Sequence, residues 1–133
     1  MGGYVKSKTL AEKAAWDFQK GLPDDKKFEI VTINPCLVEG PTLIPGGFTS
    51  ANMLLRFFNG SMTEVSRSFC GIVDVRDVSK MHLEAIRRAD AANQRFIAYA
   101  ERITMMQWAT WLHEEFAAKG YNIPTKEAGG VAD

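Results

Sequence analysis

The sequence has few cysteines, no excess of charge and no long apolar run, and each absence excludes a class of protein. Cys36 and Cys70 are the two cysteines among 133 residues, too few for a disulfide framework and, unless histidine contributes, for a structural zinc site. The 16 basic and 16 acidic residues cancel, which argues against the basic face of a nucleic-acid binder. No apolar run approaches the roughly 20 residues that cross a bilayer, and Met1–Lys6 lacks the apolar core of a signal peptide. We therefore expect a cytoplasmic protein that holds no metal and binds neither nucleic acid nor membrane.

The spacing of the apolar residues predicts helices and strands in alternation. Hydrophobic residues make up 46% of the 133 residues, which supports one domain with a modest core. Helices are expected over residues 4–20, 51–58, 77–89 and 105–119. Short strands are expected over residues 28–33, 67–70, 72–75 and 95–99. This alternation indicates the α/β class with a parallel component, and the small number of strands indicates only part of a sheet.

Residues that start and stop elements divide the chain further. Thr49 or Ser50 can cap the second helix, and Thr104 can cap the last one. Residues 35–48 contain three prolines and three glycines, so we expect a long loop there, and a loop of this length is usually functional. We expect residues 1–126 to form the folded portion and residues 127–133 to be a flexible tail.

Tyr4 and Lys8 are the most informative pair of residues. They are four apart in a predicted helix, so they share one of its faces. A free phenol has a pKa of about 10, and a nearby ammonium favours the phenolate and lowers that pKa. Such a tyrosine can give a proton to a carbonyl oxygen in a reduction, or take one from an alcohol in an oxidation. The chemistry also needs a hydride carrier, which side chains cannot supply. Taken alone, a Tyr–Lys pair is more often a solvated helix face, so the surrounding residues must decide.

Those surrounding residues resemble one enzyme family. Tyr4–Trp16 resembles the active-site helix of the extended short-chain dehydrogenase/reductases, which belong to the NAD-dependent epimerase/dehydratase superfamily. Within them it is most similar to the dihydroflavonol reductase and cinnamoyl-CoA reductase group. Ile33–Pro41 resembles that group's next strand and the loop over the nicotinamide, Val73–His82 a later strand-to-helix segment, and Tyr121–Lys126 the C-terminal stretch. The four segments follow the family's order and cover nearly the whole chain. The resemblance implies the C-terminal part of a Rossmann-type doubly wound fold, with helices on a few mostly parallel strands.

The resemblance also implies roles for individual residues. Tyr4 is expected to be the catalytic acid/base, and Lys8 to bind the nicotinamide ribose hydroxyls and to lower the pKa of Tyr4. Further contacts to the cofactor are expected from Pro35, Leu37 and Val38, largely through backbone groups, and from Ser50. The cofactor of the intact enzyme would be NADP or NAD, and the substrate a small ketone or aldehyde, or the corresponding alcohol. Residues after Pro41 and around 48–58 would form the substrate-side wall.

The chain departs from the family's pattern in two ways. Cys36 stands where a small residue is common, and Glu39 stands where an apolar or aromatic residue is usual. Because a carboxylate in an apolar wall is costly unless it is paired, we expect Glu39 to face water or the loop to differ. The family's Gly-rich strand–turn–helix is also missing, since neither Gly46-Gly47 nor Gly129-Gly130 follows a strand and opens a helix. We therefore expect that the N-terminal dinucleotide-binding half is absent and that this chain alone is inactive and binds no NAD(P).

Three functions stay open. The first is the C-terminal segment of an NAD(P)H-dependent oxidoreductase that reduces a small ketone or aldehyde. The second is a non-catalytic, truncated module that pairs with another chain or forms a homo-oligomer through an exposed sheet edge. The third is a sugar-nucleotide epimerase or a hydroxysteroid dehydrogenase of the same superfamily. The run Ser7–Lys13 favours the reductase group.

Overall fold

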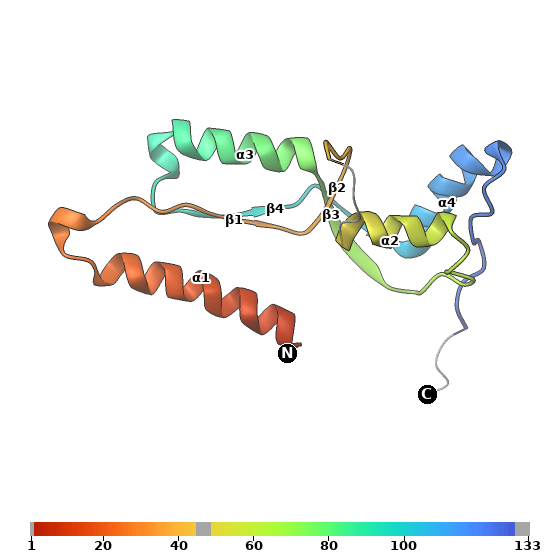
Figure 1. The fold of residues 1–133 in the computed structure, drawn as a ribbon, viewed down its shortest axis with the longest axis horizontal. Helices are drawn as coiled ribbons and strands as arrows, with labels where there is room; N and C mark the ends of the chain where they lie inside the picture. The colour runs from red at the N-terminus through yellow and green to blue at the C-terminus, as the bar shows by residue number, and fades with distance from the viewer. Residues whose placement is uncertain (1, 45–48, 130–133) are drawn as a thin grey trace. The chain divides into compact units, whose positions relative to one another are not determined.

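The computed structural model describes residues 2–44 and 49–129, which contain helices, strands and short 3-10 turns. The helices are α1 (Gly3–Gly21), α2 (Thr49–Phe58), α3 (Val75–Arg87) and α4 (Met105–Phe116), and the 3-10 turns are Asp24–Lys26, Ala89–Ala91 and Ala117–Lys119 (Figure 1). The strands are β1 (Thr32–Pro35), β2 (Leu37–Glu39), β3 (Phe69–Asp74), β4 (Arg95–Ala98) and β5 (Glu101–Thr104). These elements place the chain in the α/β class.

The described chain divides into two compact units. The first unit comprises Met1–Asn34 and Lys80–Ile97, and the second comprises Pro35–Ser79 and Ala98–Asp133. The strands divide as well, because β1 and β4 form one sheet while β2, β3 and β5 form another. The division thus follows the way in which the strands pair.

Strands β1 and β4 are parallel. The amide of Thr32 donates to the carbonyl oxygen of Gln94 at 3.1 Å, and the amide of Cys36 donates to the carbonyl oxygen of Ala98 at 3.1 Å. From the first bond to the second, the donor and the acceptor both move four residues forward in the sequence, which is the pattern of parallel strands. Helix α1 of the first unit ends at Gly21, as its glycine predicts.

The second unit contains a three-stranded sheet in the order β2-β3-β5. Strand β2 runs parallel to β3 with Leu37 opposite Ile72, and β3 runs antiparallel to β5 with Cys70 opposite Ile103. Most strand pairings of the described residues are therefore parallel, as the resemblance implied. The core of this unit lies between the sheet and helices α2 and α4, and its buried members are Phe57, Val65, Ile103, Met105, Trp108, Ala109 and Ile123.

The helix predictions lie within three residues of the observed bounds at every end. Helix α2 begins at Thr49, so Thr49 and Ser50 lie in its first turn and do not cap it. Helix α3 begins at Val75, so Asp77 is an acid of its first turn, one of the two roles that the sequence allows for it. The carboxylate of Asp74 accepts a hydrogen bond from the Arg76 amide at 2.7 Å and so caps the helix. Helix α4 ends at Phe116, and the rest of its predicted range forms a 3-10 turn. Its predicted cap is confirmed, since the hydroxyl of Thr104 accepts from the Gln107 amide at 3.0 Å.

The strand predictions are less accurate. The strand expected over 28–33 begins only at Thr32, and those expected over 67–70 and 72–75 are one strand, β3. The loop expected over 35–48 contains β2, a strand of three residues. This strand was not predicted because a proline and a glycine stand close to its two ends. Residues 45–48 of the expected loop lie outside the described part of the chain. Strand β5 was missed because Ile103 is its one buried residue, so it shows no apolar alternation.

The expected tail at 127–133 starts with residues that are hydrogen-bonded. The amide of Val65 donates to the carbonyl oxygen of Lys126, and the amide of Ala128 donates to the carbonyl oxygen of Val65, both at 2.8 Å. These bonds form a parallel bridge between Val65 and Glu127. Residues 130–133 are outside the described range. Within residues 2–44 and 49–129, no helix has the length and apolar character that crossing a bilayer requires.

Candidate functional site

The structure brings Tyr4 and Lys8 together on one face of α1. The Lys8 ammonium nitrogen lies 5.7 Å from the centre of the Tyr4 ring, and 75% of the Tyr4 side chain is exposed. The two residues are one helical turn apart, as their spacing predicts. Ser7 lies between them in sequence, and its hydroxyl donates a hydrogen bond to the Tyr4 carbonyl oxygen at 2.7 Å. The Ser7 hydroxyl is therefore bonded to the backbone and not to the Tyr4 phenol. Neither the phenol nor the ammonium is hydrogen-bonded or ion-paired to another described residue, which leaves both groups open to a ligand.

A cluster of hydrogen-bonded polar side chains connects α1 to the strands of the first unit. The Oε1 atom of Glu12 accepts hydrogen bonds from Thr32 Oγ1 at 3.0 Å, Asn34 Nδ2 at 3.2 Å and Arg95 Nε at 2.7 Å. Its Oε2 atom accepts from the Arg95 terminal nitrogen at 3.3 Å. The hydrogen bond from Arg95 is the main cause that lowers the pKa of Glu12; partial burial opposes it, and Thr32 and Asn34 add to it. Figure 1 shows α1 running alongside β1 and β4, which carry these partners.

The cluster around Glu12 is not predicted from the sequence. Glu12 lies four residues after Lys8 and eight after Tyr4, so it continues the same side of α1. That spacing is a signal that could have identified Glu12 as a neighbour of the pair. Its partners Thr32 and Arg95 were not detectable in the same way, because they lie 20 and 83 residues away along the chain.

The residues expected to contact the cofactor through their backbone lie in the second unit. Pro35 is exposed at the end of β1, and Leu37 and Val38 are half-buried in β2. Leu37 and Val38 pair with β3 on one side, and β2 is the edge of its three-stranded sheet on the other. Ser50 is half-buried in the first turn of α2, which contacts β2. The structure therefore places Leu37, Val38 and Ser50 on neighbouring elements, with backbone groups of β2 unused by its own sheet.

The expectation that Glu39 faces water is wrong. Glu39 is half-buried at the end of β2, and its Oε1 atom is buried without a hydrogen-bond partner among the described residues. This burial raises the pKa of Glu39 above its ordinary value. The nearby Cys70 thiol also has a raised pKa, first because of burial and then because of the charges of Cys36 and Glu39. Cys36 donates its thiol proton to the Ala98 carbonyl oxygen at 3.2 Å, so it is not poised as a nucleophile.

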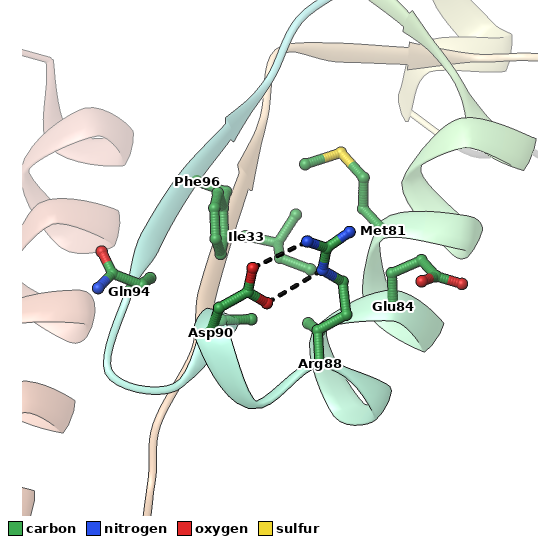
Figure 2. A pocket seen from close by; sticks show the side chains of 9 residues that line it. Ile33, Met81, Glu84, Arg88, Asp90, Gln94 and Phe96 are labelled. Carbon is green, nitrogen blue, oxygen red and sulfur yellow. Dashed lines mark hydrogen bonds and ion pairs between the residues drawn. The ribbon is translucent and has the colours of Figure 1, made fainter.

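A separate cavity of about 430 Å³ lies in the first unit between α3 and the strands β1 and β4. Figure 2 shows Met81 reaching into it from α3, with Ile33 and Phe96 opposite. At its edge the guanidinium of Arg88 binds the Asp90 carboxylate through bonds of 3.0 and 2.8 Å, so this cation is already neutralised. None of the predicted site residues lines the cavity. Across residues 2–44 and 49–129, no group of histidine, cysteine and carboxylate side chains could hold a metal ion.

Comparisons with known proteins support the family suggested by the sequence. No protein-family model matches the chain. The chain is 34% identical to the NADPH-dependent methylglyoxal reductase GRE2 of Saccharomyces cerevisiae over 99% of its own length and 40% of the relative's. It is 40% identical to the cinnamoyl-CoA reductase CAD2 of Medicago truncatula over 78% of its length and 32% of the relative's.

Solved structures show the same relationship. The crystal structure of the yeast methylglyoxal/isovaleraldehyde reductase Gre2 complexed with NADPH matches with a TM-score of 0.77 and 33% identity. The match covers 96% of this chain and 39% of that one, so the fold is Rossmann-like over the matched residues. The chain thus spans about two fifths of the length of the relatives it matches. Over that span, it belongs to the extended short-chain dehydrogenase/reductase family.

Proposed function

We propose that the chain supplies the acid/base helix and part of the cofactor and substrate site of an NADPH-dependent reductase of small ketones or aldehydes. The observation that carries the proposal is the exposed Tyr4 phenol with the Lys8 ammonium 5.7 Å from its ring, on a helix of a chain homologous to such reductases. The yeast relative GRE2 is NADPH-dependent and its solved structure is complexed with NADPH, which makes NADPH the first cofactor to test.

Two features of the chain fit a nicotinamide cofactor. The Lys8 ammonium makes no ion pair with a described residue, so its N–H donors are available to ribose hydroxyls. The free edge of β2 offers backbone donors and acceptors from alternate residues of Leu37–Glu39, which suit an amide group such as the nicotinamide carboxamide. Pro35, two residues before β2, and Ser50, on helix α2, are proposed to contact the cofactor as well. When bound, the cofactor supplies the hydride that side chains cannot provide.

In this mechanism the chain's own task is proton transfer. Tyr4 donates its phenolic proton to the substrate carbonyl oxygen while the carbonyl carbon is reduced, and it regains a proton from solvent afterwards. Lys8 favours the phenolate that remains by placing a positive charge beside the ring. Lys8 also fixes the cofactor through its ribose hydroxyls. The same two residues catalyse the reverse oxidation when Tyr4 begins as phenolate.

The decisive experiment compares Tyr4→Phe with Tyr99→Phe in the full gene product that contains residues 1–133. Loss of a general acid costs about 10²- to 10⁴-fold in turnover, so we expect Tyr4→Phe to lower kcat by at least about 100-fold with NADPH and methylglyoxal. Tyr99→Phe is the matched control, because it removes one phenol elsewhere. Normal turnover by Tyr4→Phe would reject the proposed role.

A second candidate function rests on the surface of α1. No residue of this 19-residue helix is buried, and Leu10 and Phe18 expose 53% and 63% of their side chains. Large exposed apolar surface is a common feature of association sites. The chain on its own is in this view a non-catalytic module that self-associates or pairs with another chain. Binding of NADPH by the isolated chain, measured by calorimetry, would contradict the module and favour an autonomous enzyme.

A further inference from the structure

Glu12 forms an ion pair with Arg95 and lies at a pairing spacing from a second cation, Lys8. It lies four residues after Lys8 on α1, a spacing at which lysine and glutamate side chains pair on a helix surface. In the structure, however, both Glu12 oxygens are taken by Arg95, and the Lys8 ammonium lies over the Tyr4 ring. The choice of partner by Glu12 therefore decides what Lys8 contacts.

The geometry explains why Glu12 pairs with Arg95 and not with Lys8. Its planar guanidinium binds the two carboxylate oxygens at 2.7 and 3.3 Å, a forked contact that a lysine ammonium cannot make. Thr32 and Asn34, two residues apart on β1, donate to the same carboxylate from a single face of the strand. The side chain of Glu12 is 18% exposed, so it lies against the strands while Lys8 remains at the surface.

Few other contacts hold α1 in place. None of its residues is fully buried, and within residues 2–44 and 49–129 the other side-chain hydrogen bond from α1 to the rest of the unit runs from Gln19 Nε2 to the Phe28 carbonyl oxygen at 2.8 Å. The rotation of the helix, which sets where Tyr4 and Lys8 point, thus depends strongly on Glu12.

We propose that Arg95 is a positioning residue: by occupying Glu12 it prevents a Lys8–Glu12 ion pair and leaves the Lys8 ammonium for Tyr4 and the cofactor ribose. The proposal rests on the proposed function only in treating Tyr4 and Lys8 as the working pair. Removing Arg95 leaves the partly buried Glu12 carboxylate without its ion-pair partner, and Lys8, one helical turn before it, moves toward Glu12 and away from the ring.

The test reads Lys8 directly and does not depend on turnover. In the chain labelled with carbon-13 lysine, the Tyr4 ring current shifts the terminal methylene protons of Lys8, a signal assigned by its loss in Lys8→Arg and by its return to a random-coil position in Tyr4→Leu. Arg95→Gln frees Glu12 to pair with Lys8. Such a helical pair is favoured by about twofold, so roughly two thirds of the ring-current shift should disappear.

The second-site variant separates positioning from simple loss of structure. The substitution Glu12→Gln keeps an oxygen for Thr32 and Asn34 but removes the charge, so Glu12→Gln combined with Arg95→Gln should restore the Lys8 signal of the wild-type chain. A Lys8 signal that is unchanged in Arg95→Gln, or that stays displaced in the double variant, would overturn the proposal. If Arg95→Gln fails to fold, Glu12→Gln still decides: a wild-type Lys8 signal supports the proposal, and a displaced one shows that Glu12 already holds Lys8 and rejects it.

The enzyme provides an independent readout. In the full gene product, Arg95→Gln should raise the KM for NADPH about twofold or more while kcat changes less, and Glu12→Gln in the same chain should reverse the increase. Failure of Tyr4→Phe to lower turnover would reject the proposed function but leave the Lys8 signals interpretable. Failure of the Lys8 signals to move would reject the role of Arg95 and leave the roles of Tyr4 and Lys8 standing.

Discussion

Gly40 and Val75 approach so closely that a Cβ atom added to Gly40 would lie 2.7 Å from Val75 Cγ1. Gly40 also has a φ angle of +135°, which L side chains rarely adopt. Gly40 directly follows β2, and Val75 is the first residue of α3. Both residues belong to the second unit, so their contact is one of its internal packing contacts.

Gly40→Ala should therefore destabilise the second unit by about 2–3 kcal/mol, the sum of backbone strain and a forced shift of a β-branched side chain. Gly60→Ala is the matched control, because Gly60 has a φ of +76° but nothing within 4 Å of an added Cβ. It should cost only about 1 kcal/mol of strain. Urea unfolding measures both, and equal losses would show that the contact with Val75 contributes nothing.

Glu39 should make stability depend on pH. Burial raises its pKa above the ordinary 4.5, so the folded chain keeps the proton to a higher pH than the unfolded chain does. The free energy of unfolding then falls as pH rises from about 4.5 through the raised value. Glu39→Gln keeps the shape without the charge, so it should remove this decline and be more stable than wild type at neutral pH. Urea midpoints across this range test it, with Glu101→Gln as the control at an exposed carboxylate; parallel curves for Glu39→Gln and wild type would contradict the prediction.

Local patterns made part of this structure predictable. The helix at 4–20 and the meeting of Tyr4 with Lys8 follow from spacings of three and four residues, which a helix turns directly into contacts. The cap of α4 at Thr104 is equally local, since its partner is three residues away. Such features depend on a few neighbouring residues and need no knowledge of the rest of the fold.

What the sequence did not reveal depends on distant partners. Strand β2 is three residues long and exists because it pairs with β3, which lies more than thirty residues later. Glu12 looks like an ordinary surface residue of a helix until Arg95, 83 residues away, is brought beside it. The burial of Glu39 likewise results from tertiary packing, which overrode the expectation that a carboxylate faces water. Pairing across such separations leaves no periodic signal in a single sequence.

Asp74 should produce a pH dependence of the opposite sign. Its hydrogen bonds from the side chain and backbone of Arg76 lower its pKa from 3.8 to about 2. The stabilisation is therefore complete above pH 3.8 and is lost as the pH falls toward about 2. Asp74→Asn should remove this acid-dependent step and retain α3, because asparagine also caps helices. Helical circular dichroism during acid titration measures it, and an undiminished acid step in the variant would exclude Asp74 as its source.

The cap of α4 offers a test of a single hydrogen bond. Thr104 Oγ1 accepts from the Gln107 amide, one of the amides at the start of the helix that lack an intrahelical partner. Thr104→Ala should cost about 1 kcal/mol of stability, whereas Thr104→Ser keeps the acceptor and should cost less. Thermal unfolding of the two variants provides the comparison, and a serine variant as unstable as the alanine one would show that the methyl group, not the hydroxyl, matters.

The exposed side of α1 should govern association of the isolated chain. Leu10 and Phe18 expose more than half of their side chains, and burying such side chains releases about 1.5–3 kcal/mol each. We therefore expect the chain to form concentration-dependent oligomers, and Leu10→Lys with Phe18→Lys to shift it toward monomer. Leu55→Lys, at a 50% exposed position of α2, is the control for added charge and should leave association unchanged. Sedimentation velocity distinguishes these cases. A wild-type chain that stays monomeric at every concentration would show that this side of α1 does not drive association. A Leu55→Lys variant that dissociates as readily as the α1 double variant would show the same.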